Sequence, residues 1–169
     1  RETLTGPGSP FLPHVRTDLM EYLIESDNYI SRMQLDYFWS PKKDLYAKLS
    51  TGIFEMMYGG YGGEILYKPF DSNFMIGIEA YRVKKRDFDQ KLNFLDYETT
   101  TGHVNFNYYF NELGIIANLS VGKYLAKDTG YTLDLSRITS SGFRTGIFFT
   151  RTNVSAAEFG EGSFDKGFY

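Results

Sequence analysis

Residues 74–81 read Phe74-Met75-Ile76-Gly77-Ile78-Glu79-Ala80-Tyr81, so apolar and small or polar side chains alternate along the chain. Successive side chains of a β-strand point to opposite faces of its sheet. One face of this strand would therefore carry Phe74, Ile76, Ile78 and Ala80, and the other Met75, Gly77, Glu79 and Tyr81. This stretch predicts a strand that separates an apolar surface from a polar one.

The same alternation recurs in three other stretches, 45–53, 103–110 and 115–122. Lipid bathes one face of a transmembrane β-barrel, and water or a plug occupies the other. The repeated pattern therefore predicts an all-β, antiparallel up-and-down meander that forms part of a transmembrane β-barrel.

About eight strands are expected, and tight links alternate with longer or glycine-rich ones. The strands are predicted at 29–39, 44–56, 62–69, 74–83, 100–110, 114–124, 130–138 and 143–152. Tight turns are predicted at 40–43, 70–73, 111–113 and 139–142, and the other links at 57–61, 84–99, 125–129 and everything after Asn153. Outer-membrane barrels sort short periplasmic turns and longer outer loops to opposite ends in this way.

The N-terminal segment 1–28 is expected to be an irregular or short helical segment at the rim or in the lumen of the barrel. Residues 1–13 are rich in Gly and Pro, whereas Val15, Leu19 and Leu23 recur with helical spacing between Val15 and Ser26. The rest, 29–169, is expected to be a barrel section, and the whole chain to be one part of a longer polypeptide. The closing pair Phe168-Tyr169 could open another strand.

Composition excludes several classes of partner and site. The formal net charge of −3 gives no basic field, so nucleic acid is not an expected partner. The chain has no cysteine, which excludes a disulfide scaffold and a thiolate metal site. Its two histidines, His14 and His103, lie far apart, and a hydrogen-bonding role is favoured for His103 over metal ligation. No cofactor and no metal are expected.

Polar side chains of the inward face are the candidate contacts to a polymer in the lumen. They are Lys48, Glu55, Glu64, Glu79, Tyr81, His103, Asn105, Asn107, Asn118, Asp134 and Arg144. Lys48, Arg82 and Arg144 are expected to meet the acids there. A set of salt bridges that stiffens the barrel is the favoured interpretation of these charges, and a polymer-contact or selectivity surface is the functional one.

Catalysis is not expected, although two motifs allow it. Asp128-Thr129-Gly130 matches the triplet of aspartic proteases but is also ordinary hairpin sequence. Glu64 and Glu79 could serve as a glycosidase pair if the fold placed them opposite one another. The cluster 56–63, rich in Gly and Tyr, is interpreted as a sharp hairpin or a site of close backbone packing, or as a surface that stacks on sugar rings.

Four strings of the chain together resemble one family. They are 4–18, from Leu4 to Asp18; 52–69, which includes Tyr58-Gly59-Gly60-Tyr61-Gly62-Gly63; 122–130; and 159–167, which reads Phe159-Gly160-Glu161-Gly162-Ser163-Phe164-Asp165-Lys166-Gly167. The chain is thereby similar to the YjbH-type exopolysaccharide and capsule biosynthesis proteins of Gram-negative bacteria, which include the GfcD-like proteins. The resemblance implies an outer-membrane β-barrel of a longer chain, with no established catalytic residues.

The leading expectation is an outer-membrane barrel component that assists exopolysaccharide or capsule export or assembly. Its expected partners are outer-membrane lipid, the exopolysaccharide and other polysaccharide-secretion proteins. Two alternatives stay open. One is a soluble β-sandwich or calyx that binds a ligand, in which the apolar face would be a core. The other is an envelope enzyme, either a glycosidase or an aspartic protease.

Overall fold

The computed structural model describes residues 19–25, 28–154 and 164–168. One helix precedes a single sheet of nine antiparallel strands, which lie side by side in the order of the sequence. The elements are α1 (Leu19–Glu25), β1 (Met33–Lys42), β2 (Leu45–Ile53), β3 (Tyr58–Tyr67), β4 (Phe74–Arg86), β5 (Phe94–Phe110), β6 (Ile115–Lys123), β7 (Thr129–Ile138), β8 (Arg144–Thr152) and β9 (Phe164–Phe168). The predicted all-β meander is confirmed.

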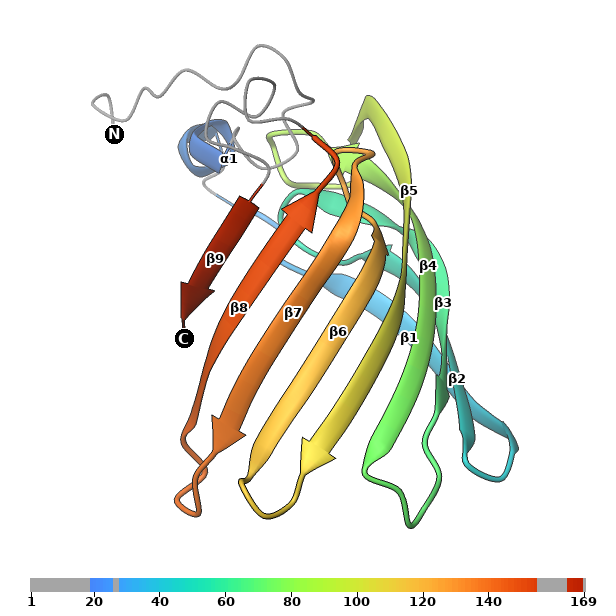
Figure 1. The fold of residues 1–169 in the computed structure, drawn as a ribbon. Helices are drawn as coiled ribbons and strands as arrows, with labels where there is room; N and C mark the ends of the chain where they lie inside the picture. Colours follow the sequence, from blue (N-terminus) through green and yellow to red (C-terminus); the bar gives the residue numbers. More distant parts are fainter. Residues whose placement is uncertain (1–18, 26–27, 155–163, 169) are drawn as a thin grey trace.

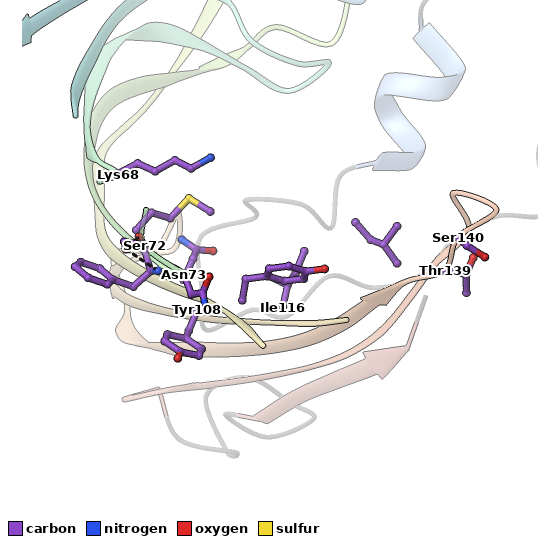
Figure 2. Close-up of a pocket in the computed structure, with 12 residues that line it drawn as sticks. Lys68, Ser72, Asn73, Tyr108, Ile116, Thr139 and Ser140 are labelled. Atoms are coloured by element: carbon purple, nitrogen blue, oxygen red, sulfur yellow. Dashed lines mark hydrogen bonds between the residues drawn. The ribbon is translucent and has the colours of Figure 1, made fainter. Parts of the chain in front are cut away.

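The sheet is strongly curved, and its two faces differ in chemistry (Figure 1). Figure 2 shows Lys68 and Ile116 on the inside of the curve and Tyr108 on the outside. The strand register extends this division to the whole sheet, because Ile116 shares its face with Asn118, and Tyr108 shares its face with Phe106. The concave face is therefore the polar one, and the convex face is the apolar one.

The apolar side chains of the convex face are exposed and do not form a core. Every strand contributes one or more of them, with exposed fractions such as 72% for Leu35, 57% for Ile78 and 59% for Ile147. Across the sheet the set includes Leu35, Leu49, Ile65, Ile78, Val104, Val121, Leu133, Ile147 and Phe168. The described residues place no second layer of structure over this face, in contrast to the core of a soluble sandwich.

The ends of the sheet are sorted as expected, but two of the expected long links are wrong in extent. The turns at 43–44, 68–73, 111–114 and 139–143 lie at one end, and α1 lies at the other (Figure 1). The link expected at 84–99 shrinks to 87–93, because β4 and β5 extend to 13 and 17 residues and remain paired beyond Val83. Apolar and polar residues do not alternate in these extensions, so the sequence alone does not predict them as strand.

The link expected at 57–61 is also wrong, because β3 already begins at Tyr58. Gly59 and Gly60 pair with Lys84 and Val83 of β4. A Cβ atom at Gly60 would lie 2.1 Å from the carbonyl oxygen of Arg82, so any side chain there would push the strands apart. The glycine-rich cluster thus serves close backbone packing inside a strand and does not form the turn.

The sheet is not closed into a barrel within the described residues. β1 pairs with β2 and β9 pairs with β8, and the outer edge of each has no neighbour in the sheet. β9 lies in the stretch after Asn153 that the sequence predicts to be a link, so that prediction is wrong for residues 164–168. Its register, from Ile147↔Phe168 to Arg151↔Phe164, continues the meander by one strand.

A small core lies at the α1 end of the sheet. It consists of Tyr22, Met57, Tyr58 and Val83, with Phe88 among the side chains packed against it. The expected helix is confirmed over Leu19–Glu25, the part of that stretch that the structure describes; Tyr22 is buried, whereas Leu23 is 50% exposed. Val15 lies outside the described residues. No helix in the described part of the chain is long and apolar enough to cross a bilayer.

Candidate functional site

A row of four charged or titratable side chains crosses the concave face from β2 to β5. The register pairs Lys48 with Glu64, Glu64 with Glu79, and Glu79 with His103. Lys48 Nζ lies 2.6 Å from Glu64 Oε1, and His103 Nδ1 lies 3.0 Å from Glu79 Oε1. Two carboxylates that face each other on neighbouring strands repel. Here Lys48 binds the Glu64 carboxylate and His103 binds the Glu79 carboxylate, which offsets that repulsion.

Hydroxyl groups continue this network on the same face. The Tyr81 hydroxyl donates to Glu64 Oε1, and the Ser50 hydroxyl donates to Asp36 Oδ1. Beyond β5, the rings of His103 and Tyr124 meet edge to face at 4.7 Å. The Tyr124 hydroxyl then bonds Thr132 Oγ1 at 2.7 Å. The hydrogen-bonding role expected for His103 is confirmed.

Three amides form the middle of the concave face. Asn105 and Asn107 lie on β5, and Asn118 lies opposite Asn107 on β6. Within residues 19–25, 28–154 and 164–168, no other protein group hydrogen-bonds these three side chains, and the buried Asn118 Oδ1 has no partner. A buried amide oxygen without a partner costs about 1–3 kcal/mol. The amides are thus available to water or to a ligand.

A second charge pair lies further along the sheet. Asp134 of β7 faces Asn118 in the register. Arg144 Nη2 of β8 lies 3.8 Å from Asp134 Oδ1 and donates to Ser136 Oγ at 3.0 Å. The expected meeting of Arg144 with an acid of the polar face is therefore confirmed.

Three cavities follow one another along the concave side of β4 and β5. The upper cavity, of about 480 Å³, lies towards α1 and is lined by Lys48, Tyr81, His103 and Tyr124 among others. The middle cavity, of about 330 Å³, is lined by Glu64, Glu79 and the three amides Asn105, Asn107 and Asn118 among others. The two charge pairs Lys48–Glu64 and His103–Glu79 each span the boundary between them.

The lower cavity, of about 550 Å³, lies at the tight-turn end and shares Asn107 with the middle one (Figure 2). Its concave lining is more apolar and includes Met75, Tyr109 and Ile116, with Lys68 at its side. Figure 2 shows Ser140 and Thr139 of the β7–β8 turn at its far margin. The three cavities lie in a row along the concave face, and we call this row the groove.

Two expected polar-face residues lie elsewhere. Glu55 falls in the turn between β2 and β3 and not in the row of strand side chains, and its carbonyl accepts a hydrogen bond from Arg86. Arg82 lies on the convex face, where it pairs with Glu98 of β5. The expectation that Arg82 meets the polar-face acids is wrong, because it is an even-numbered residue in a strand whose odd-numbered side chains face inward.

A buried arginine that no sequence motif marks joins α1, the β2–β3 turn and the β4–β5 link. Arg86 is 0% exposed, and its guanidinium donates to backbone carbonyls. The acceptors are the carbonyl oxygens of Ile30, Glu55, Met56, Gln90 and Lys91. The Tyr22 hydroxyl donates to the Arg86 carbonyl. Only the fold brings these carbonyls together, so no local sequence signal marked Arg86.

The structure places the motifs considered for catalysis and metal binding in different parts of the sheet. Asp128-Thr129-Gly130 closes the β6–β7 hairpin, where Tyr124 N donates to the Asp128 carbonyl at 2.8 Å. No group of three or more His, Cys, Asp or Glu that could hold a metal ion occurs among the described residues. His14 lies outside them.

Glu64 and Glu79 do lie opposite each other, as the glycosidase hypothesis requires.

Comparisons with known proteins place the chain beside proteins of polysaccharide biosynthesis. A family model described as exopolysaccharide biosynthesis protein YbjH matches residues 2–169. The protein named uncharacterized lipoprotein YjbH of Escherichia coli (strain K12) is 39% identical over 168 residues, which cover 96% of this chain and 24% of that relative. The chain thus spans about a quarter of the relative's length. No solved structure matches it.

Proposed function

The chain belongs to the YjbH exopolysaccharide biosynthesis family, and from this premise we propose that its sheet is a section of an outer-membrane β-barrel that assists export or assembly of exopolysaccharide or capsule. The observation that carries the proposal is the exposed apolar band of the convex face, set against a polar concave face. Lipid solvates such a band, and a hydrated interior solvates the charges and amides.

The proposal requires neighbours for both outer edges of the sheet. Unpaired strand edges are not tolerated in hydrocarbon, because each free N–H and C=O group costs several kcal/mol. In the proposed barrel, other strands of the full-length protein pair with β1 and β9. The name lipoprotein, carried by the relative from Escherichia coli, is in keeping with a place in the cell envelope.

We propose a structural role, and not catalysis, for the facing pair Glu64 and Glu79. A glycosidase of this geometry needs one carboxyl group free to give up a proton and the other free to attack. Glu64 is bound by Lys48 and Tyr81, and Glu79 is bound by His103. Release of reducing ends from a polysaccharide by the full-length protein would contradict this assignment.

Site-directed labelling tests the membrane orientation. Single cysteines replace Ile78 and Glu79, neighbours on opposite faces of β4, in the full-length protein in lipid vesicles. A spin label at position 78 should be relaxed mainly by oxygen, which partitions into lipid, and a label at 79 mainly by a water-soluble nickel complex. Val104→Cys and His103→Cys provide the matched pair on β5. Equal access of the nickel complex to all four positions would overturn the proposal.

A further inference from the structure

We propose that the groove along β4 and β5 holds an extended chain of uncharged sugar units, with the amides of Asn105, Asn107 and Asn118 as its central hydrogen-bonding contacts. This inference rests on the proposed function and names the substrate class of the same concave face. It depends on three features of the groove: its length, the pairing of the carboxylates at its middle and the free state of its amides.

The cavities of the groove follow one another along the same two strands. The middle and lower cavities share Asn107, and the pairs Lys48–Glu64 and His103–Glu79 lie between the upper and middle cavities. β4 and β5 are 13 and 17 residues long, and a strand rises about 3.3 Å per residue. Because the lining residues of β5 run from Thr101 in the upper cavity to Tyr109 in the lower one, the row of cavities is about 26 Å long, which suits several sugar units in line better than a compact small molecule.

The carboxylates at the middle of the groove are bound within the protein, whereas Lys68 of the lower cavity and Arg32 of the upper one are not part of these pairs. Glu64, Glu79 and Asp134 are bound by Lys48, His103 and Arg144, respectively. An acidic polymer would have to draw Lys48 or Arg144 away from its carboxylate, and a basic one would have to displace those cations. Because leaving one member of such a pair without its partner is costly, the middle of the groove, where the amides lie, gains little from a charged ligand. An uncharged ligand leaves the pairs intact.

The amides are the groups that remain to bind a ligand. Each offers two N–H donors and one carbonyl acceptor. A sugar hydroxyl both donates and accepts, so it can satisfy either end of an amide. Asn118 Oδ1, which is buried without a partner among residues 19–25, 28–154 and 164–168, needs a donor of this kind. Asn107 faces it across the register and Asn105 follows on the same face, which gives a compact set of contacts.

Aromatic side chains flank the amides along the groove. Tyr81 and Tyr124 line the upper cavity, and Tyr109 lines the lower one. Aromatic rings in a binding groove pack against the apolar faces of sugar rings, while polar groups hold the hydroxyls in place. Repeated weak contacts of this kind retain a polymer without stopping it, as movement through a pore requires.

The test measures binding of oligosaccharides to the full-length protein in detergent by saturation-transfer NMR and calorimetry. The uncharged probes are maltohexaose, cellohexaose and laminarihexaose, and the acidic probe is hexagalacturonate. We expect at least one uncharged probe to bind at least tenfold more tightly than the acidic probe. The triple variant Asn105→Ala, Asn107→Ala, Asn118→Ala should weaken that binding at least tenfold.

Asn93→Ala is the matched control, because Asn93 is an exposed amide in the β4–β5 link outside the groove. It should leave binding unchanged. Tighter binding of hexagalacturonate, no binding of any uncharged probe, or unchanged binding in the triple variant would overturn the inference. Heat-modifiable gel mobility of the same preparation separates the two proposals: a folded barrel without sugar binding removes this inference alone, and a protein that shows no barrel behaviour removes the proposed function.

Discussion

Arg82 and Arg86 lie only four residues apart in β4, yet they have different roles. In the sequence, both are cationic residues near the end of β4. Arg82 is exposed on the convex face and pairs with Glu98, whereas Arg86 is wholly buried and binds several backbone carbonyls. The guanidinium has five N–H donors, which suits it to gather carbonyl groups from several segments at once. Arg86 therefore fixes the α1 end of the sheet.

We expect Arg86→Gln to lower the free energy of unfolding by about 2–4 kcal/mol, because several buried carbonyls lose their donor at once. Arg82→Gln is the matched control and should have a much smaller effect, since it removes only an exposed ion pair. Urea unfolding of the full-length protein, followed by tryptophan fluorescence, measures both. Equal effects of the two substitutions would show that Arg86 does not join these segments.

At the scale of the element, β3 depends on glycine to approach β4. A Cβ atom at Gly60 would lie 2.1 Å from the Arg82 carbonyl oxygen, whereas at Gly77 of β4 the nearest atoms would be 3.7 Å away. Distances near 3.7 Å are ordinary van der Waals contacts. The two glycines therefore have different roles, although both lie in strands on the concave face.

Gly60→Val should prevent normal pairing of β3 with β4 and reduce the yield of folded protein severely, because the strands cannot stay hydrogen-bonded around the added side chain. Gly77→Ala should fold like the unmodified protein. The fraction that migrates as the heat-modifiable folded form on gels gives the yield of each variant. If Gly60→Val folded as well as Gly77→Ala, the close approach of the two strands would not be needed.

At the scale of the whole molecule, the sheet leaves three surfaces without partners among its described residues: the convex face and the outer edges of β1 and β9. Exposed apolar surface and open strand edges both promote association in water. A lipid bilayer would cover the convex face, and further strands would cover the edges. The stability of this section is thus tied to its surroundings.

The section of 169 residues, expressed alone, should therefore not persist as a monomer in water. Size-exclusion chromatography with light scattering, in buffer with and without detergent, measures this directly. We expect large aggregates without detergent and smaller, defined particles with it. A stable monomer in plain buffer would favour the soluble calyx or sandwich.

The amino-acid sequence by itself determined the strands and their two faces, because alternation of side chains along a strand is a local property. Lys48, Glu64, Glu79, His103, Asn105, Asn107 and Asn118 were assigned to the polar face from that alternation alone. Only the tertiary structure decided which of them meet, since the distance between strands depends on register and curvature. That step set Glu64 against Glu79 and buried Arg86 among carbonyls from three segments, whereas the side of Arg82 follows from the alternation along β4.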